Sequence, residues 1–302
     1  SYFVSLAARK EVTVAISGTG GDEIFAGYPW FISMAKYQCS LRQSPWNIHR
    51  QIKTVKQISR HLVDVGLQRE IPEKDIGCDP DGFLSEYASN YNIFGSNGAK
   101  ALMPPALQES SQAGLQECRD LKPTDELSQG SAIERVSGLV LRGYTNNQLL
   151  RDIDAVSMSH SLEVRVPYLD TVIADLALSL PDSAKLGNPE KIKHSIHATY
   201  RSSGAKRILI DVGHNLLPKD FDLQPKRGFS MPFDVWLQGP LNTILEDTLS
   251  SSCVKERGLL KPDEVQTIKK RYYEKKIGWG QPWLLMMLEL WNQEILDPYS
   301  PS

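Results

Sequence analysis

The amino-acid sequence predicts an α/β protein that holds an incomplete parallel sheet and a large α-helical portion. Three observations lead to this prediction: a β-branched run at residues 12–16, a glycine-rich turn directly after it, and helical spacing of apolar residues along much of the chain. A strand without polar alternation is typical of a parallel sheet covered on both faces. Because a complete sheet of this kind needs several strands and only one is convincing, we expect further strands before Ser1.

The predicted elements follow one another in a mostly helical order. Residues 1–10 are expected to end a helix, and the strand follows at residues 12–16. Residues 24–34 then begin a helix that Pro29 is expected to bend. Residues 206–217 fit either a helix or a strand. Apolar residues at helical spacing predict further helices at residues 41–70, 131–151, 172–180 and 283–291. We expect the Trp and Met side chains of the last of these helices to lie in the core.

Composition and charge exclude several classes of protein. The 302 residues carry 34 Lys and Arg against 36 Asp and Glu, so the net charge of −2 lacks the basic excess of a nucleic-acid binder. No apolar run reaches the roughly 18 residues of a membrane span. The four cysteines lie far apart and favour reduced thiols in a cytoplasmic protein. They are Cys39, Cys78, Cys118 and Cys253.

The strongest local signal is the loop Ser17-Gly18-Thr19-Gly20-Gly21-Asp22-Glu23. Glycines let the backbone approach a bulky anion, and N–H groups at the end of a strand attract negative charge. Asp22 and Glu23 would repel a bare phosphate, so the loop suits a nucleotide bridged by magnesium. A simple tight turn is the alternative that the spacing leaves open. No Lys follows the glycines, which excludes the P-loop arrangement.

A second segment, residues 151–170, alternates charged residues with small and apolar ones. Charged side chains in such surroundings are usually paired, which predicts an ion pair between Glu163 and Arg165. Asp152 and Asp154 are two residues apart and cannot both face the same side of a helix. One of them is a candidate for a site.

A third segment, residues 225–232, places two cations beside a glycine on a loop bounded by prolines. Lys226 and Arg227 are candidates to clamp a phosphoryl group. A solvated loop is the alternative.

Together the three segments resemble the C-terminal synthetase domain of the glutamine-dependent asparagine synthetase family. Residues 17–28 are similar to that family's SGxGxDELFGGY loop, and residues 150–170 to its LLRDxDxxSMxxSLExRVPFLD segment. Residues 226–229 and 236–241 resemble KRGF and WLxGPL. The similarity runs in the family's order from the first residues to about residue 295. It implies an adenine-nucleotide α-hydrolase-like parallel sheet with an α-helical cap.

The resemblance also implies an ATP-dependent ligase. ATP and Mg²⁺ would activate the side-chain carboxylate of aspartate as an acyl-adenylate, and ammonia derived from glutamine would attack it to give asparagine. By this resemblance Lys226 stabilises charge on the α-phosphate, and Asp152 lies near the acyl acceptor or orients the amine. The implied nucleotide-binding residues are Ser17, Gly18, Thr19 and Gly20, and the implied metal ligand is Asp22.

The sequence departs from the family pattern at three points. It contains neither the SGGxDS pyrophosphate loop nor the glutaminase domain with its N-terminal cysteine nucleophile. Residues 1–302 are therefore expected to be the later part of an asparagine synthetase-type amidotransferase domain, inactive as a fragment. Thr19 stands where the family usually has Glu or Asp, and a hydroxyl cannot act as a carboxylate base near neutral pH.

Two alternatives remain open for the function. One is a related amidotransferase or cyclase with another acceptor, and the other is a truncated nucleotide-binding pseudoenzyme. The expected partners are aspartate, ATP and ammonia from the missing N-terminal glutaminase domain. We expect no nucleic acid and no membrane, and a homodimer stays open.

Overall fold

The computed structural model describes residues 1–43, 82–90, 92–108, 129–188, 192, 199–224 and 231–299. The chain divides into two compact units. Unit 1 comprises Ser1–Gln43, Asp81–Tyr87 and Pro123–Gly228, and unit 2 comprises Ser44–Pro80, Ala88–Lys122 and Phe229–Ser302. The predicted helix at residues 41–70 falls almost entirely outside the described residues, and so does Lys226.

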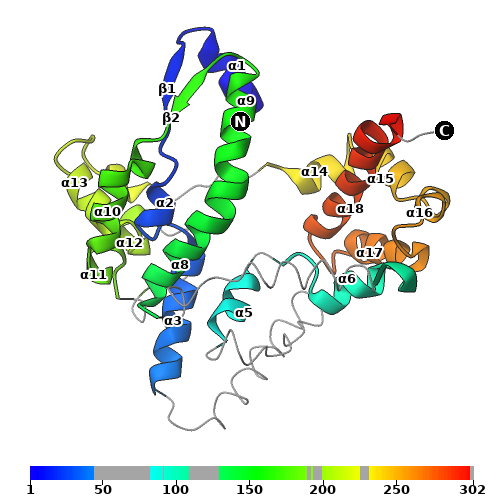
Figure 1. Cartoon of the computed structure of the whole chain (residues 1–302), viewed down its shortest axis with the longest axis horizontal. Coiled ribbons are helices and arrows are strands. Elements are labelled where there is room, and N and C mark those ends of the chain that lie inside the picture. Colours follow the sequence, from blue (N-terminus) through cyan, green and yellow to red (C-terminus); the bar gives the residue numbers. More distant parts are fainter. Residues whose placement is uncertain are drawn as a thin grey trace. The chain divides into compact units, whose positions relative to one another are not determined.

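Unit 1 is mostly helical (Figure 1). Its helices are α1 (Tyr2–Arg9), α2 (Gly21–Ile24), α3 (Pro29–Gln43), α5 (Phe83–Ala88, whose last residue is counted in unit 2), α8 (Ala132–Val140), η2 (Leu141–Leu149), α9 (Leu150–Met158), η3 (Pro167–Leu169), α10 (Thr171–Ser179), α11 (Asp182–Lys185), α12 (Tyr200–Ser203), α13 (Arg207–Gly213) and η4 (Phe221–Leu223).

Among the described residues, unit 1 contains a two-stranded parallel sheet. β1 (Val14–Ile16) pairs with β2 (Glu163–Arg165) in a register that sets Val14 opposite Glu163. The predicted Glu163–Arg165 ion pair is confirmed, with 2.7 Å between Oε1 and Nε. The expectation that β1 is covered on both faces is wrong, because Ile16 is 78% exposed. The two strands that the described residues form make too small a sheet to be covered on both faces.

The predicted helix at residues 131–151 is confirmed as one continuous helical rod (Figure 1). It begins with a capping box, in which Ser131 Oγ accepts a hydrogen bond from Glu134 N and Glu134 Oε2 accepts one from Ser131 N. The middle of the rod is the π-helix η2, whose wider turns separate α8 from α9.

Two apolar clusters hold unit 1 together. In the first, Phe31 and Met34 of α3 pack with Val136 and Val140 of α8. The second joins Ile24 of α2 to α10 and α13, so it lies directly beneath the glycine-rich loop. Pro29 does not bend a helix but is the first residue of α3, where its missing N–H costs nothing. Residues 207–213 are helical, which settles the ambiguity left by the sequence.

Unit 2 is helical in its described residues. Its helices are α6 (Ser96–Leu102), α14 (Phe233–Gln238), α15 (Asn242–Thr248), α16 (Ser251–Arg257), α17 (Pro262–Tyr273), α18 (Gly280–Trp291), η5 (Asn292–Leu296) and η6 (Asp297–Tyr299). The predicted C-terminal helix is confirmed, but its buried face differs from the expected one. Leu285 and Met286 are in the core, whereas Met287 and Trp291 are exposed.

Within the described part of the chain, no helix combines the length and the apolar character that crossing a bilayer requires.

Candidate functional site

The glycine-rich loop connects the carboxyl end of β1 to α2, and its glycines serve different purposes. Gly20 has a φ of +98°, and a Cβ there would lie 2.7 Å from the Leu169 side chain. Gly21 packs against Tyr168. A Cβ at Gly18 would meet nothing within 4 Å. A ligand can therefore come close to the backbone at Gly18, whereas Gly20 and Gly21 allow the loop to pack on η3.

Two hydroxyl groups meet at the start of this loop. Ser17 Oγ and Thr19 Oγ1 are 2.8 Å apart, and Thr19 N donates to Ser17 Oγ over 3.2 Å. Ser17 N donates to Arg165 O of β2, which extends the sheet pairing into the loop. The four residues predicted to bind nucleotide thus form one continuous turn at the end of a parallel strand, where ligands of α/β proteins commonly bind.

Asp22 forms an ion pair that the sequence did not predict. Its Oδ1 lies 3.0 Å from Nζ of Lys206, and both side chains are partly buried. The pair packs against Gly27, where a Cβ would lie only 1.9 Å from Asp22 Oδ1. Lys206 Nζ also lies 3.8 Å from the position of a Cβ on Gly21, so its ammonium group stands beside the loop. No sequence signal pointed to this lysine, which begins a segment of ambiguous pattern.

Glu23 is 1% exposed and is held by hydrogen bonds on both its side chain and its backbone. Tyr28 OH donates to Glu23 Oε1 over 2.7 Å, and Ser137 Oγ of α8 donates to Glu23 O over 2.9 Å. Burial raises the pKa of Tyr28, and its hydrogen bond to Glu23 raises it further. Tyr28 therefore stays protonated as a donor, and the pair fixes the start of the chain that follows the loop.

Asp152 is exposed on α9, and its charge acts on Tyr144 of η2. Burial raises the pKa of Tyr144, and the nearby carboxylates of Glu23, Asp152 and Asp22 raise it further. In an α-helix at 100° per residue, the eight residues from Tyr144 to Asp152 would leave them about 80° apart around the axis. The wider turns of η2 reduce that offset, which brings the two residues closer to one side of the helical rod.

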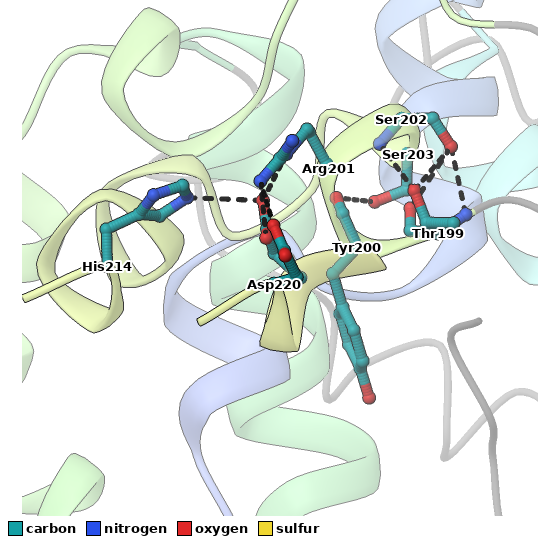
Figure 2. A network of polar contacts seen from close by, with 8 residues as sticks. Thr199, Tyr200, Arg201, Ser202, Ser203, His214 and Asp220 are labelled. Atoms are coloured by element: carbon teal, nitrogen blue, oxygen red, sulfur yellow. Dashed lines mark hydrogen bonds and ion pairs between the residues drawn. The ribbon is translucent and has the colours of Figure 1, made fainter. Parts of the chain in front are cut away.

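A separate charged cluster joins α12, α13 and η4 (Figure 2). Asp222 has a 1% exposed side chain, and Arg201 holds both of its oxygens, with 2.8 Å from Nη2 to Oδ1. His214 Nε2 lies 3.2 Å from Asp222 Oδ2. The hydrogen bonds from Arg201 lower the pKa of the Asp222 carboxyl, so it remains charged inside the fold. Tyr200 N donates to Gln224 O, the last described residue before Lys226.

The described residues contain no group of three or more His, Cys, Asp and Glu side chains placed to hold a metal ion. This part of the chain therefore offers no cage made of protein ligands alone. Mg²⁺ is commonly bound by one or two carboxylates together with phosphate oxygens of a substrate. Asp22, beside the open backbone of Gly18, has the oxygen chemistry that such a site requires.

Comparisons with known proteins agree on one family. The asparagine synthase family profile matches residues 1–293. Asparagine synthetase [glutamine-hydrolyzing] 1 of Bacillus subtilis is 26% identical over 322 residues, which cover 100% of this chain and 44% of that protein. A putative asparagine synthetase of Mycobacterium tuberculosis H37Rv is 24% identical over 241 residues, covering 78% of this chain and 32% of its own length.

The human asparagine synthetase [glutamine-hydrolyzing] is 31% identical over 117 residues, which cover 35% of this chain and 19% of that protein. The chain thus spans less than half the length of these curated relatives. No solved structure matches the chain significantly. Because the family profile extends over nearly all of its residues, the chain belongs to the asparagine synthase family.

Proposed function

We propose that this chain forms the later part of the ATP-dependent domain of an asparagine-forming synthetase, with an adenine-nucleotide α-hydrolase-like fold. The observation that supports this most is the loop Ser17–Asp22 at the carboxyl end of parallel β1, with Lys206 beside it. A carboxylate oxygen of aspartate attacks the α-phosphorus of ATP, and pyrophosphate leaves. Ammonia then attacks the acyl carbon of the acyl-adenylate, and AMP leaves with the electron pair of the broken C–O bond.

The loop residues bind the nucleotide through backbone and hydroxyl groups. The backbone at Gly18 has the open space that a phosphate needs, and the hydroxyls of Ser17 and Thr19 can turn their protons toward phosphate oxygens instead of toward each other. Lys206 supplies a positive charge beside the same loop. These groups together offset the negative charge that a nucleotide brings.

Asp22 is the residue that would hold Mg²⁺, which supplies a positive charge to phosphate oxygens when bound. Lys206 contacts Asp22 Oδ1 and keeps the carboxylate in a fixed orientation. The same ammonium group can move to a phosphate oxygen, because a lysine side chain is long and flexible.

Lys226 and Asp152 complete the proposed chemistry. Lys226 follows Gln224 by two residues and stabilises charge that develops on the α-phosphate. Asp152, whose side chain is exposed on α9, orients the attacking amine. The ammonia comes from glutamine hydrolysed by a separate domain.

Calorimetric titration of residues 1–302 with Mg-ATP and with AMP tests the nucleotide site. We expect binding by the wild-type chain and a loss of about tenfold to a hundredfold in affinity for Lys206→Met, since a hydrogen bond to a charged group is lost. Lys219→Met, at an exposed position, is the matched control and should bind like the wild type. A wild-type chain that binds neither nucleotide contradicts the proposal.

A second candidate function keeps the activation by ATP but uses a different acceptor. The observation that favours it is Thr19, whose hydroxyl pairs with Ser17 at a position where a carboxylate could serve as a base. Dependence of pyrophosphate release on aspartate distinguishes the two in a protein that contains the full domain. Release that does not require aspartate would favour the second function.

A further inference from the structure

Lys206 stands at a sharp corner between two short helices. α12 has four residues and α13 has seven, and helices this short are not stable by themselves. The corner contains two residues in the left-handed region, Gly204 with φ +66° and Lys206 with φ +52°. A lysine in this conformation is strained, so contacts from the rest of the fold must hold it there.

The corner itself is docked against the glycine-rich loop. Lys206 N donates to Phe25 O over 3.2 Å, next to the ion pair between Lys206 Nζ and Asp22. Gly187 N donates to Gly204 O over 2.8 Å. These contacts hold the tip of the corner, and Ile208 and Leu209 of α13 pack against the apolar cluster of α2 and α10.

Asp222 adds a link between the two helices, because it binds both of them at once. Arg201 belongs to α12, and His214 directly follows the last residue of α13. Arg201 and His214 both contact Asp222. Arg201 Nη2 also lies 4.0 Å from Oδ1 of Asp220, which Figure 2 labels in the same cluster. Because the Asp222 side chain is 1% exposed, its charge must be compensated, and removing it would leave Arg201 and His214 without their shared partner.

The element that carries Asp222 also packs on both helices. A Cβ on Gly213 would lie 2.7 Å from the Phe221 ring, and the rings of His214 and Phe221 meet edge to face at 5.7 Å. Tyr200 N, at the start of α12, donates to Gln224 O. η4 and the residue that follows it therefore contact both α12 and α13.

We infer that Asp222 is a positioning residue: by clamping α12 and the end of α13 together, it holds Lys206 at the glycine-rich loop. It contacts neither Asp22 nor Lys206 and acts through the two helices. Tyr200 N, at the start of α12, also holds Gln224 O by a hydrogen bond, two residues before Lys226. The consequence for nucleotide binding rests on the proposed function, whereas the placement of Lys206 does not.

The reactivity of Lys206 toward acetic anhydride, followed by mass spectrometry of the folded chain, tests this inference. In the wild type the ion pair with Asp22 should protect Lys206. Asp222→Asn keeps the shape of the side chain but removes its charge, and we expect Lys206 to react about tenfold faster. The reactivity of Lys269, which is buried in unit 2 and bound to Glu246, should not change.

Glu246→Gln is the matched control variant, because it removes the carboxylate partner of a lysine in the other unit. It should expose Lys269 and leave Lys206 protected. Arg201→Lys retains the charge but loses the two-pronged contact, so it should increase the reactivity of Lys206 by a smaller factor. If Asp222→Asn does not fold, the reactivity of Lys206 in Arg201→Lys tests the inference instead, and unchanged reactivity there overturns it.

Titration with Mg-ATP under conditions where circular dichroism shows both proteins folded separates positioning from stability. A merely structural Asp222 would lower the melting temperature and leave the affinity unchanged. We expect the affinity of Asp222→Asn to fall by about tenfold. Unchanged reactivity of Lys206 in a folded Asp222→Asn overturns the inference. Increased reactivity in a chain whose wild type binds no nucleotide upholds the inference and removes the proposed function.

Discussion

At the scale of single residues, the hydrogen bond from Tyr28 to Glu23 connects the glycine-rich loop to the core. Tyr28→Phe removes the phenol hydroxyl that donates to Glu23 Oε1. The buried Glu23 carboxylate then loses this hydrogen bond. We expect the free energy of unfolding to fall by about 1–3 kcal/mol in urea denaturation. Ser40→Ala, at an exposed position of α3, should change it by less than about 0.5 kcal/mol.

The same pair gives a prediction at alkaline pH. The pKa of Tyr28 is raised above its ordinary value of 10.0, so the folded state holds this proton more tightly than the unfolded state. The stabilisation is complete below pH 10.0 and is lost as the pH rises toward the higher pKa of the folded state. Denaturation midpoints measured above pH 10 should decline less steeply for Tyr28→Phe than for the wild type. Equal slopes would contradict this.

The pKa of Lys185 is shifted in the opposite direction, so its effect on stability with pH also has the opposite sign. Its side chain is fully buried, its Nζ donates to Leu178 O over 3.5 Å, and burial lowers its pKa below 10.5. The unfolded state therefore binds this proton more readily, and stability rises with pH toward 10.5. Lys185→Met should raise the free energy of unfolding at pH 7 by about 1 kcal/mol, by analogy with other buried ions. Lys255→Met, on the surface of α16, should have no such effect.

At the scale of elements, the capping box at Ser131 sets where the long helical rod begins. Ser131 Oγ accepts from Glu134 N and also donates to Asp182 Oδ1, which links α8 to α11. Ser131→Ala should lower the free energy of unfolding by about 1 kcal/mol, as for other N-cap residues. Thermal melting compared with Ser159→Ala, an exposed serine after α9, checks this prediction. A loss of equal size in both variants would contradict a capping role.

The rod also illustrates how one irregular element can serve a site. Apolar spacing predicts a helix through residues 131–151, and that helix is present. The spacing does not distinguish an α-helix from a π-helix, because both keep apolar residues three to five positions apart on one side. The structure shows that the middle of this helix is the π-helix η2 and that Tyr144, which it carries, feels the charges of Glu23, Asp152 and Asp22.

At the scale of the whole molecule, unit 1 exposes apolar side chains on α1, on β1 and between them. Phe3, Val4, Val12, Val14 and Ile16 are between 38% and 78% exposed. Exposed apolar side chains that gather on one surface commonly mark an interaction site or promote association.

We therefore expect residues 1–302 alone to self-associate with rising concentration in sedimentation velocity. Ile16→Lys should reduce that association, because a charge on this surface opposes burial. Val172→Lys, at a similarly exposed position of α10, is the control and should not reduce it. Association that responds equally to both substitutions would show that the surface on α1 and β1 is not responsible.

The local features of this protein can be predicted from its amino-acid sequence. β-branched residues followed by glycines predict β1 and its loop, and apolar spacing predicts the helices at residues 131–151, 172–180 and 283–291, all of which are present with somewhat different bounds. These features depend on residues that are close together along the chain, so propensity and periodicity suffice to predict them. The motif resemblance then indicated the family, which the family profile confirms.

The contacts between residues that are distant in the chain emerge from the folded structure. It brought β2 beside β1, Lys206 to Asp22, and Arg201 and His214 to Asp222, and it left Ile16 exposed where the sequence predicts burial. Each of these outcomes depends on packing between segments that are far apart in the chain. Local propensity carries no information about such partners, because the free energy that selects them comes from burial and charge pairing in the assembled fold.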